Sequence, residues 1–448
     1  MFSHSDLQSV SLPLPEDVLK KKYAGDIEGA LRAVRYRLAQ PGLPECMAQR
    51  LRAEEGILTE LPFAYPYTEE EALALLQRAV PDFTAEELSA FEEEGKIDFQ
   101  WIDGKKRYLR SFVASLFHSC DDLARRAGRP HDASNADRLR RVIAEVRENG
   151  VCKRRIRMKA SLKIKDEFFV PGETYLVHIP IPIEEAEIRY VRLLSFSHAP
   201  KSISSNSAPQ RTVAFEEVLA ENAPFFVEYE YDVIIRRAQG YDAPPPNADD
   251  LSEHAPHILF TPYMRSLERE LSKGLTDPEA KARAYYDFIT TRTTYSYVRD
   301  YFLIDDAGEY VAKNRKGDCG LQALCFITLC RIGGIPARWQ SGLYVHDEDA
   351  GCHDWAMFFT KDRLWRFCDP SFGGSAYRQG DEVRRDFYFG NLDPFRMAAN
   401  RAYYVPFAPE KCFPRNDPYD NQSGECESTV KAYPERELET KCVVLSME

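Results

Sequence analysis

The chain lacks several features that define common protein classes. Its eleven cysteines contain no C-x-x-C pair and are scattered through 448 residues, which favours reduced thiols over a disulfide framework. No window approaches the roughly 18 uninterrupted apolar residues of a membrane span. The opening residues MFSHSDLQSVSLPLPEDVLKKK lack the apolar core of a signal peptide. We therefore expect a cytoplasmic protein with no membrane partner, unless a leader was removed before residue 1.

Basic charge is also scarce. The chain has 59 Lys and Arg against 71 Asp and Glu, a net charge of −12, whereas nucleic-acid binders usually carry a basic face. A nucleic-acid partner is therefore not expected, although residues 153–165 form a local basic stretch. The composition is otherwise that of a soluble globular protein, and the chain is long enough for two or three domains.

Residues 1–150 are predicted to form a mainly helical N-terminal region. Thr68 with Glu71, and Thr84 with Glu87, have the spacing of capping boxes at two helix starts. Asp103-Gly104 predicts a hairpin turn between later helices. Helix, hairpin and helix together resemble a small winged module, but the acidic sequence between them favours a structural or partner-docking role.

The hydrophobic period changes at residue 151. In RIRMKASLKIK, residues 155–165, apolar and basic or polar residues alternate, and FFVEYEYDVII repeats the pattern at 225–235. The two prolines of TYLVHIPIPI favour an edge strand between them. We predict an antiparallel β-sandwich over 151–238 with a solvated basic face, and a Pro-rich linker over 239–256.

The remainder, 257–448, is predicted to hold a catalytic core with a C-terminal loop-rich extension. Its centre is KGDCGLQALCFITLCRIGGIPARW, residues 316–339, with three cysteines. The apolar residues leave almost no polar face, which predicts a helix buried on nearly all sides. Cys325 and Cys330 fit its apolar body, and Cys330 lies about 16 Å along the helix from Cys319, too far to share a metal ion.

Cys319 stands at the start of this helix, where free N–H groups and the helix dipole favour an anion. We expect this position to lower the thiol pKa, provided that Asp318 caps the helix and faces away from the sulfur. A base is offered by His353 in CHDWAMFF and an orienting group by Asp369 in RLWRFCDPSFGG. A hairpin turning at Lys361-Asp362 would place them opposite each other, or within one residue of it.

The joint pattern predicts a Cys319–His353–Asp369 triad. Taken alone, Cys319 also fits a core thiol, His353 a hydrogen-bonded strand histidine, and Asp369 a turn residue before Pro370. A zinc site at Cys352, His353 and Cys368 is a further alternative, but the spacing matches no usual ligand pattern. We therefore expect no metal and no cofactor.

GDCGLQALCFITLCRIGGIPARW, HDWAMFF and LWRFCDPSFGG together resemble the core of the transglutaminase-like superfamily, over about 317–373. The resemblance implies an α+β fold with a papain-like core, a buried helix packed on an antiparallel sheet, after the β-sandwich and the helical region. It implies acyl transfer through a thioester on Cys319, with His353 protonating the leaving amine and Asp369 orienting His353. Oxyanion or substrate-lining roles fall to Tyr295, Tyr297 and Trp355.

The resemblance leaves the acceptor open. We favour hydrolysis of a peptide, isopeptide or other amide substrate, because calcium-dependent cross-linking relatives carry further domains after the core and no EF-hand spacing is present. Transfer of a glutamine acyl group to amines, or a non-catalytic binding module, are the alternatives. Asn391, Arg396, Asp417 and Asn421 lie in polar loops that either frame the cleft or are simply solvated.

Overall fold

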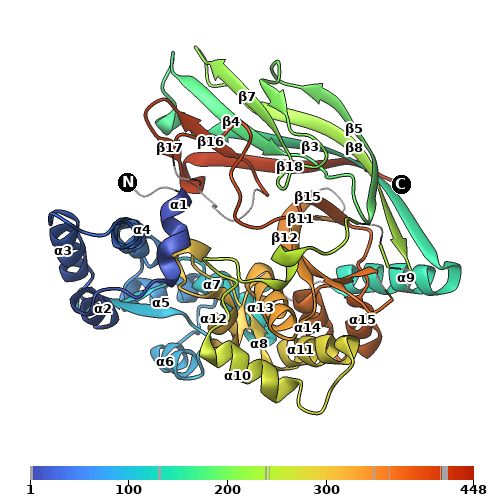
Figure 1. The fold of residues 1–448 in the computed structure, drawn as a ribbon, viewed down its shortest axis with the longest axis horizontal. Helices are drawn as coiled ribbons and strands as arrows, with labels where there is room; N and C mark the ends of the chain where they lie inside the picture. Colours follow the sequence, from blue (N-terminus) through green and yellow to red (C-terminus); the bar gives the residue numbers. More distant parts are fainter. Residues whose placement is uncertain are drawn as a thin grey trace.

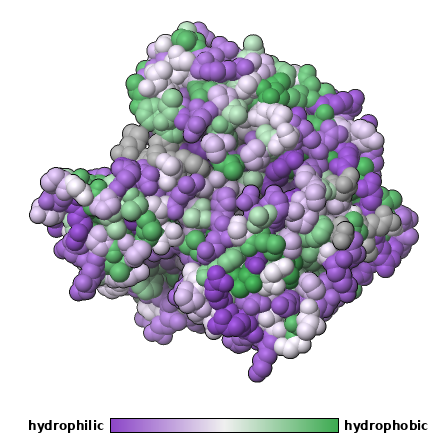
Figure 2. Space-filling model, viewed as in Figure 1, coloured by the Kyte–Doolittle hydropathy of each residue, from purple (hydrophilic) through white to green (hydrophobic). Residues whose placement is uncertain are grey.

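The computed structural model describes residues 4–129, 133–237, 240–241, 243–346, 349–362, 364–413, 415 and 422–448. Helices at the N-terminus, a β-sandwich and a core of helices on an antiparallel sheet make up the molecule (Figure 1). Among these described residues, no helix has the length and apolar character needed to cross a membrane. On the face shown in Figure 2, apolar residues occur in scattered groups among hydrophilic ones.

The N-terminal region is helical, as predicted, and packs around a hydrophobic core of its own. Both capping boxes are present, Thr68 with Glu71 and Thr84 with Glu87. The predicted hairpin turns at Asp103-Gly104, where both residues have positive φ. The elements are α1 (His4–Leu7), α2 (Glu16–Tyr23), α3 (Ile27–Leu38), α4 (Glu45–Ala64), α5 (Glu69–Ala79), α6 (Ala85–Glu93), β1 (Phe99–Ile102), β2 (Lys105–Tyr108), α7 (Phe112–Ser119), α8 (Asp121–Arg126) and α9 (Ala133–Asn149).

Two sheets form the sandwich. One contains β3 (Val151–Ile164), β8 (Phe225–Arg236) and β5 (Ile188–Phe196); the other contains β4 (Thr174–Pro180), β7 (Thr212–Val218) and β6 (Ser202–Ile203). The alternating apolar residues of β3 from Ile156 to Ile164 are buried, as the pattern predicted. Its basic residues pair with acids on β8, for example Arg155 with Asp232 at 2.8 Å and Arg157 with Glu228. Part of the basic face is therefore paired with acidic side chains of the neighbouring strand.

The C-terminal residues complete this sandwich, which differs from the loop-rich extension expected there. Strand β18 (Leu438–Met447) pairs along β3, and β16 (Glu425–Ser428) pairs with both β4 and β17 (Ala432–Tyr433). Strand β4 therefore lies between β7 and β16 and is not the edge strand that its prolines suggested; Pro180 is its last residue. Pairing between segments so far apart leaves no local signal in the sequence.

The core packs α13 (Cys319–Ile332) against β11 (Ala337–His346) and β12 (Asp349–Phe359). Helix α13 is buried from Cys319 to Arg331 and ends before Gly333, as predicted, and Cys325 and Cys330 are free thiols inside it. The same sheet includes β13 (Trp365–Cys368), β14 (Phe389–Gly390) and β15 (Arg396–Asn400), and β12 joins β18 at Asp349 and Val443. Around it lie α10 (Pro262–Leu271), α11 (Pro278–Arg292), α12 (Ala307–Asn314), α14 (Pro370–Arg378) and α15 (Glu382–Phe387).

Candidate active site

Cys319 is the first residue of α13, and the fold positions it through the residues just before it. Asp318 caps the helix by accepting a hydrogen bond from the Leu321 N–H at 3.0 Å, and Tyr301 donates to the same carboxylate at 2.8 Å. The thiol is only 8% exposed. Its Sγ donates to Oδ2 of Asp354 at 3.4 Å. Within the described residues it forms no hydrogen bond with His353.

The pKa of Cys319 is raised well above its usual value, which corrects the expectation of a lowered one. Burial is the largest cause, followed by the negative charges of Asp354 and Asp318. Asp318 does cap the helix, as required, but its carboxylate stays close enough to oppose the thiolate. The effect of the helix N-terminus is smaller than that of a buried site with two carboxylates.

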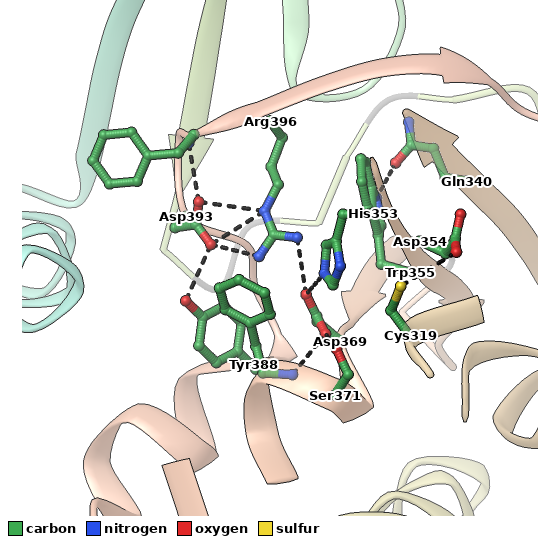
Figure 3. Close-up of polar contacts among 12 residues, drawn as sticks. Cys319, Gln340, His353, Asp354, Trp355, Asp369, Ser371, Tyr388, Asp393 and Arg396 are labelled. Carbon is green, nitrogen blue, oxygen red and sulfur yellow. Dashed lines mark hydrogen bonds and ion pairs between the residues drawn. The ribbon is translucent and has the colours of Figure 1, made fainter. Parts of the chain in front are cut away.

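His353 and Asp369 form a direct pair. Nε2 of His353 lies 2.8 Å from Oδ2 of Asp369, and both side chains are buried. Asp369 also caps α14 by accepting from the Phe372 N–H at 3.0 Å. Because Nε2 is bonded to Asp369, Nδ1 is the ring nitrogen that could take part in proton transfer. In the view of Figure 3, the Cys319 sulfur lies on the other side of the ring from Asp369.

The hairpin register differs from the predicted one by two residues. Ala356 pairs with Cys368 and Phe359 with Trp365, so continuing this register places Asp369 beside Trp355 rather than His353. The cause is a longer turn, closed by a hydrogen bond from the Thr360 N–H to the Leu364 carbonyl at 3.0 Å. Because the shift is two residues, His353 and Asp369 remain on one face of the sheet and still meet diagonally.

A buried arginine stabilises the pair from behind. Arg396 has no exposed surface; its Nη1 lies 2.9 Å from Oδ2 of Asp369, and its Nε donates to Asp393 at 3.1 Å (Figure 3). The ring of Phe372 lies 4.5 Å from the guanidinium carbon. Arg396 is on strand β15 and not in a solvated loop, so the solvated alternative for this residue is wrong.

These contacts set the ionisation of the pair. Burial raises the pKa of Asp369, but His353 and Arg396 outweigh it and bring the pKa to about 2. Burial lowers the pKa of His353 below its usual 6.5; Asp369 acts against this, and Arg396 adds to it. At neutral pH the pair is therefore a neutral imidazole bonded to a carboxylate, the form of a general base held by an orienting group.

We predict that the Asp369→Asn variant lowers the pKa of His353 further, because it removes the charge that favours the imidazolium. The pKa can be followed by the side-chain NMR signals of His353. In the wild type, a folded-state pKa below 6.5 means that His353 contributes full stability above pH 6.5 and loses it as the pH falls toward the folded value. A His353 pKa that rises in Asp369→Asn would contradict the assigned pairing.

The other predicted residues are placed as follows. Tyr295, on β9 (Thr294–Tyr295), pairs with Gly317 on β10 (Lys316–Gly317). The pKa of Tyr295 is raised by burial and then by Cys319, and that of Tyr297, which is 41% exposed, has the same two leading causes. Trp355 is fully buried and donates its indole N–H to Gln340. It therefore supports the sheet beside His353.

Of the residues assigned to the polar loops, Asn391 is partly exposed, whereas Asp417 and Asn421 lie outside the described residues. Sequence reasoning did not identify Asp354, Gln422 and Tyr301 as contributors to the site. Asp354 stands between two motif residues, in H-D-W, and this acid in an otherwise apolar strand was the available signal. Arg396, in the apolar run FRMAA, gave a similar signal of a buried charge.

Gly320 lies where Cys319, Tyr301 and Asp354 meet. A Cβ there would come 2.1 Å from the Tyr301 hydroxyl and 2.7 Å from Oδ2 of Asp354. We expect Gly320→Ala to destabilise the fold by about 1–3 kcal/mol and to alter the reactivity of Cys319, because both side chains must shift. Gly351→Ala, on β12, is the control, since nothing lies within 4 Å of its Cβ position. Equal losses in chemical unfolding of the two variants would contradict this packing.

The alternative of a metal site at this position can be compared with the contacts of its candidate ligands. Within the part of the chain that the structure describes, no group of three or more His, Cys, Asp or Glu side chains is placed to hold a metal ion. Of the zinc candidates, His353 directs Nε2 to Asp369, and Cys352 lies with its Sγ 3.1 Å from the Ser423 hydroxyl. The Nε2 atom of His353 is therefore engaged with a carboxylate and not with a metal ligand set.

A cysteine at the start of a buried helix, against a sheet with a histidine–aspartate pair, is the arrangement of papain-like cysteine enzymes. Residues 265–370 match the family model of the transglutaminase-like superfamily, and this part of the chain is a transglutaminase-like core. The match supports cysteine-based catalysis. No curated protein matches the chain by sequence.

Solved structures give partial matches. A candidate cysteine protease from Cytophaga hutchinsonii is 16% identical with a TM-score of 0.40, over 66% of this chain and 91% of that one. The periplasmic domain of TgpA from Pseudomonas aeruginosa is 14% identical with a TM-score of 0.27, over 51% of this chain and 92% of that one.

Proposed function

We propose that the chain is a cysteine-dependent hydrolase of amide bonds in peptides or proteins, with Cys319 as nucleophile. The observation that carries this is the buried His353–Asp369 pair at 2.8 Å, in which His353 lies on β12, a strand that packs against the helix led by Cys319. Its location in the segment that matches the family model adds support. The assignment of Cys319 to a triad with His353 and Asp369 comes from the sequence motif, and the His353–Asp369 contact supports it.

In the proposed reaction, His353 Nδ1 takes the Cys319 proton and the thiolate attacks the amide carbonyl. The C–S bond forms, the C–N bond breaks, and His353 returns the proton to the leaving amine. Water then attacks the thioester with His353 as base, and the proton passes to the sulfur as the acid leaves. Asp369 and Arg396 hold the imidazole in position throughout.

A peptide library containing internal peptide bonds and side-chain amides tests this proposal. Mass spectrometry separates three products: a cleaved peptide, a side-chain acid, and an amine adduct when a primary amine is added at saturation. We expect cleaved or acid products with and without the amine, all dependent on Cys319. Amine adducts as the main product would replace hydrolysis by cross-linking, and no Cys319-dependent product would favour a binding module.

A further inference from the structure

Asp354 is engaged on both of its carboxylate oxygens. Oδ2 accepts from the Cys319 thiol at 3.4 Å, and Oδ1 accepts from Nε2 of Gln422 at 2.7 Å. The same Gln422 amide donates to the backbone carbonyl of His353 at 3.1 Å. Because side chains alternate along a strand, Asp354 points to the face of β12 opposite His353. Gln422 thus bridges the two neighbouring residues and holds the carboxylate that contacts the nucleophile.

This arrangement keeps the thiol from its base. The Sγ–H bond is directed at Asp354, while Nε2 of His353 is bonded to Asp369 on the other side. A carboxylate beside a thiol opposes formation of the thiolate, which is the reactive form. The titratable groups that act on Cys319, or on which it acts, are Asp318, Asp354, Tyr295, Tyr297 and Tyr301.

We propose that Asp354 and Gln422 form a latch that holds Cys319 as a hydrogen-bonded thiol, and that the proposed reaction requires the latch to open. This inference rests on the proposed function, because it takes Cys319 as the nucleophile. When the Asp354 contact breaks, Sγ turns to His353; the S–H bond breaks, an N–H bond forms on Nδ1, and a thiolate–imidazolium pair results. Asp354 and Gln422 are positioning residues for this step.

The position of Gln422 in the chain makes it suited to such a role. It lies shortly before β16, which begins at Glu425, and is followed by Ser423, whose hydroxyl lies 3.1 Å from Sγ of Cys352, the residue before His353. The short segment 422–424 therefore lies along β12 beside the nucleophile. The N–H groups of a peptide are chemically equivalent to the Gln422 amide as donors for Oδ1 of Asp354.

The test is the rate of iodoacetamide alkylation at Cys319 as a function of pH, measured on the Cys319 peptide by mass spectrometry in the full-length chain. In Asp354→Asn we expect the rate at pH 7 to rise about tenfold and the midpoint to fall by about one pH unit. In Gln422→Leu we expect a smaller increase, about threefold, because the carboxylate stays but loses its orienting bond. Ser423→Ala, which leaves the latch contacts intact, should match the wild type.

The possible failures are distinguishable. If Asp354→Asn and Gln422→Leu both keep the wild-type profile while Cys319 still reacts, the latch is overturned and the nucleophile assignment stands. If Cys319 stays unmodified in every folded variant while exposed cysteines react, the proposed function fails and the latch with it. Circular dichroism checks folding, and should Asp354→Asn not fold, Gln422→Leu against Ser423→Ala decides the question.

Discussion

Replacing Cys319 by alanine is expected to reduce amide turnover to the uncatalysed background, a loss on the order of 10⁴-fold or more. The reason is chemical: the sulfur is the only atom at the start of α13 able to form the thioester. The fold should persist, because alanine keeps the helix and removes a thiol that two carboxylates flank. Turnover of the peptide library is the measurement.

Cys325→Ala is the matched control for this variant, because Cys325 is a fully buried free thiol in the same helix. It should retain turnover and lose about 1 kcal/mol of stability through the small cavity. A Cys319→Ala enzyme that keeps wild-type turnover, or a Cys325→Ala enzyme that loses it while folded, would contradict the assignment of the nucleophile.

The second large effect is expected at Arg396. In Arg396→Met, the buried carboxylates of Asp369 and Asp393 lose their shared cation. Removing one partner of a buried ion pair typically costs about 3–5 kcal/mol, since the charge left behind has no compensation. The free energy of unfolding from urea titration measures this loss. Turnover should fall as well, because Asp369 no longer has a fixed position for holding His353.

Arg157→Met serves as the control for Arg396→Met. Arg157 is half-exposed and pairs with Glu228 on the sandwich surface, so its loss should cost within about 1 kcal/mol. Adding Asp393→Asn to Arg396→Met should recover part of the stability, since one uncompensated charge disappears. Equal costs for Arg157→Met and Arg396→Met would show that the buried cluster contributes little.

The local structure near the nucleophile could be predicted from the sequence because its signals are local. An apolar run between Asp318 and Gly333 defines α13, and Thr68 with Glu71 defines a capping box, without knowledge of distant residues. The pairing of His353 with Asp369 was also accessible, because a short hairpin connects them. Its register was not, because the turn between them is longer than the Lys361-Asp362 pair suggested.

Long-range features could not be read in this way. Strand β18 shows apolar residues in CVVL but no sign that it pairs with β3, which is distant from it in the sequence. The raised pKa of Cys319 depends first on burial and then on Asp354, which reaches the thiol only when β12 packs against α13. Likewise, Arg396 gains its role from Asp369 and Asp393 in a buried site that forms only in the folded chain.

Covalent trapping tests the nucleophile assignment most directly. The full-length chain would be incubated with an epoxysuccinyl peptide of the E-64 type and digested, and the modified residue identified by mass spectrometry. We predict one adduct on Cys319, absent in Cys319→Ala and formed at least about a hundredfold more slowly in His353→Ala. Modification that persists in Cys319→Ala, or proceeds equally fast without His353, would contradict a Cys319–His353 catalytic pair.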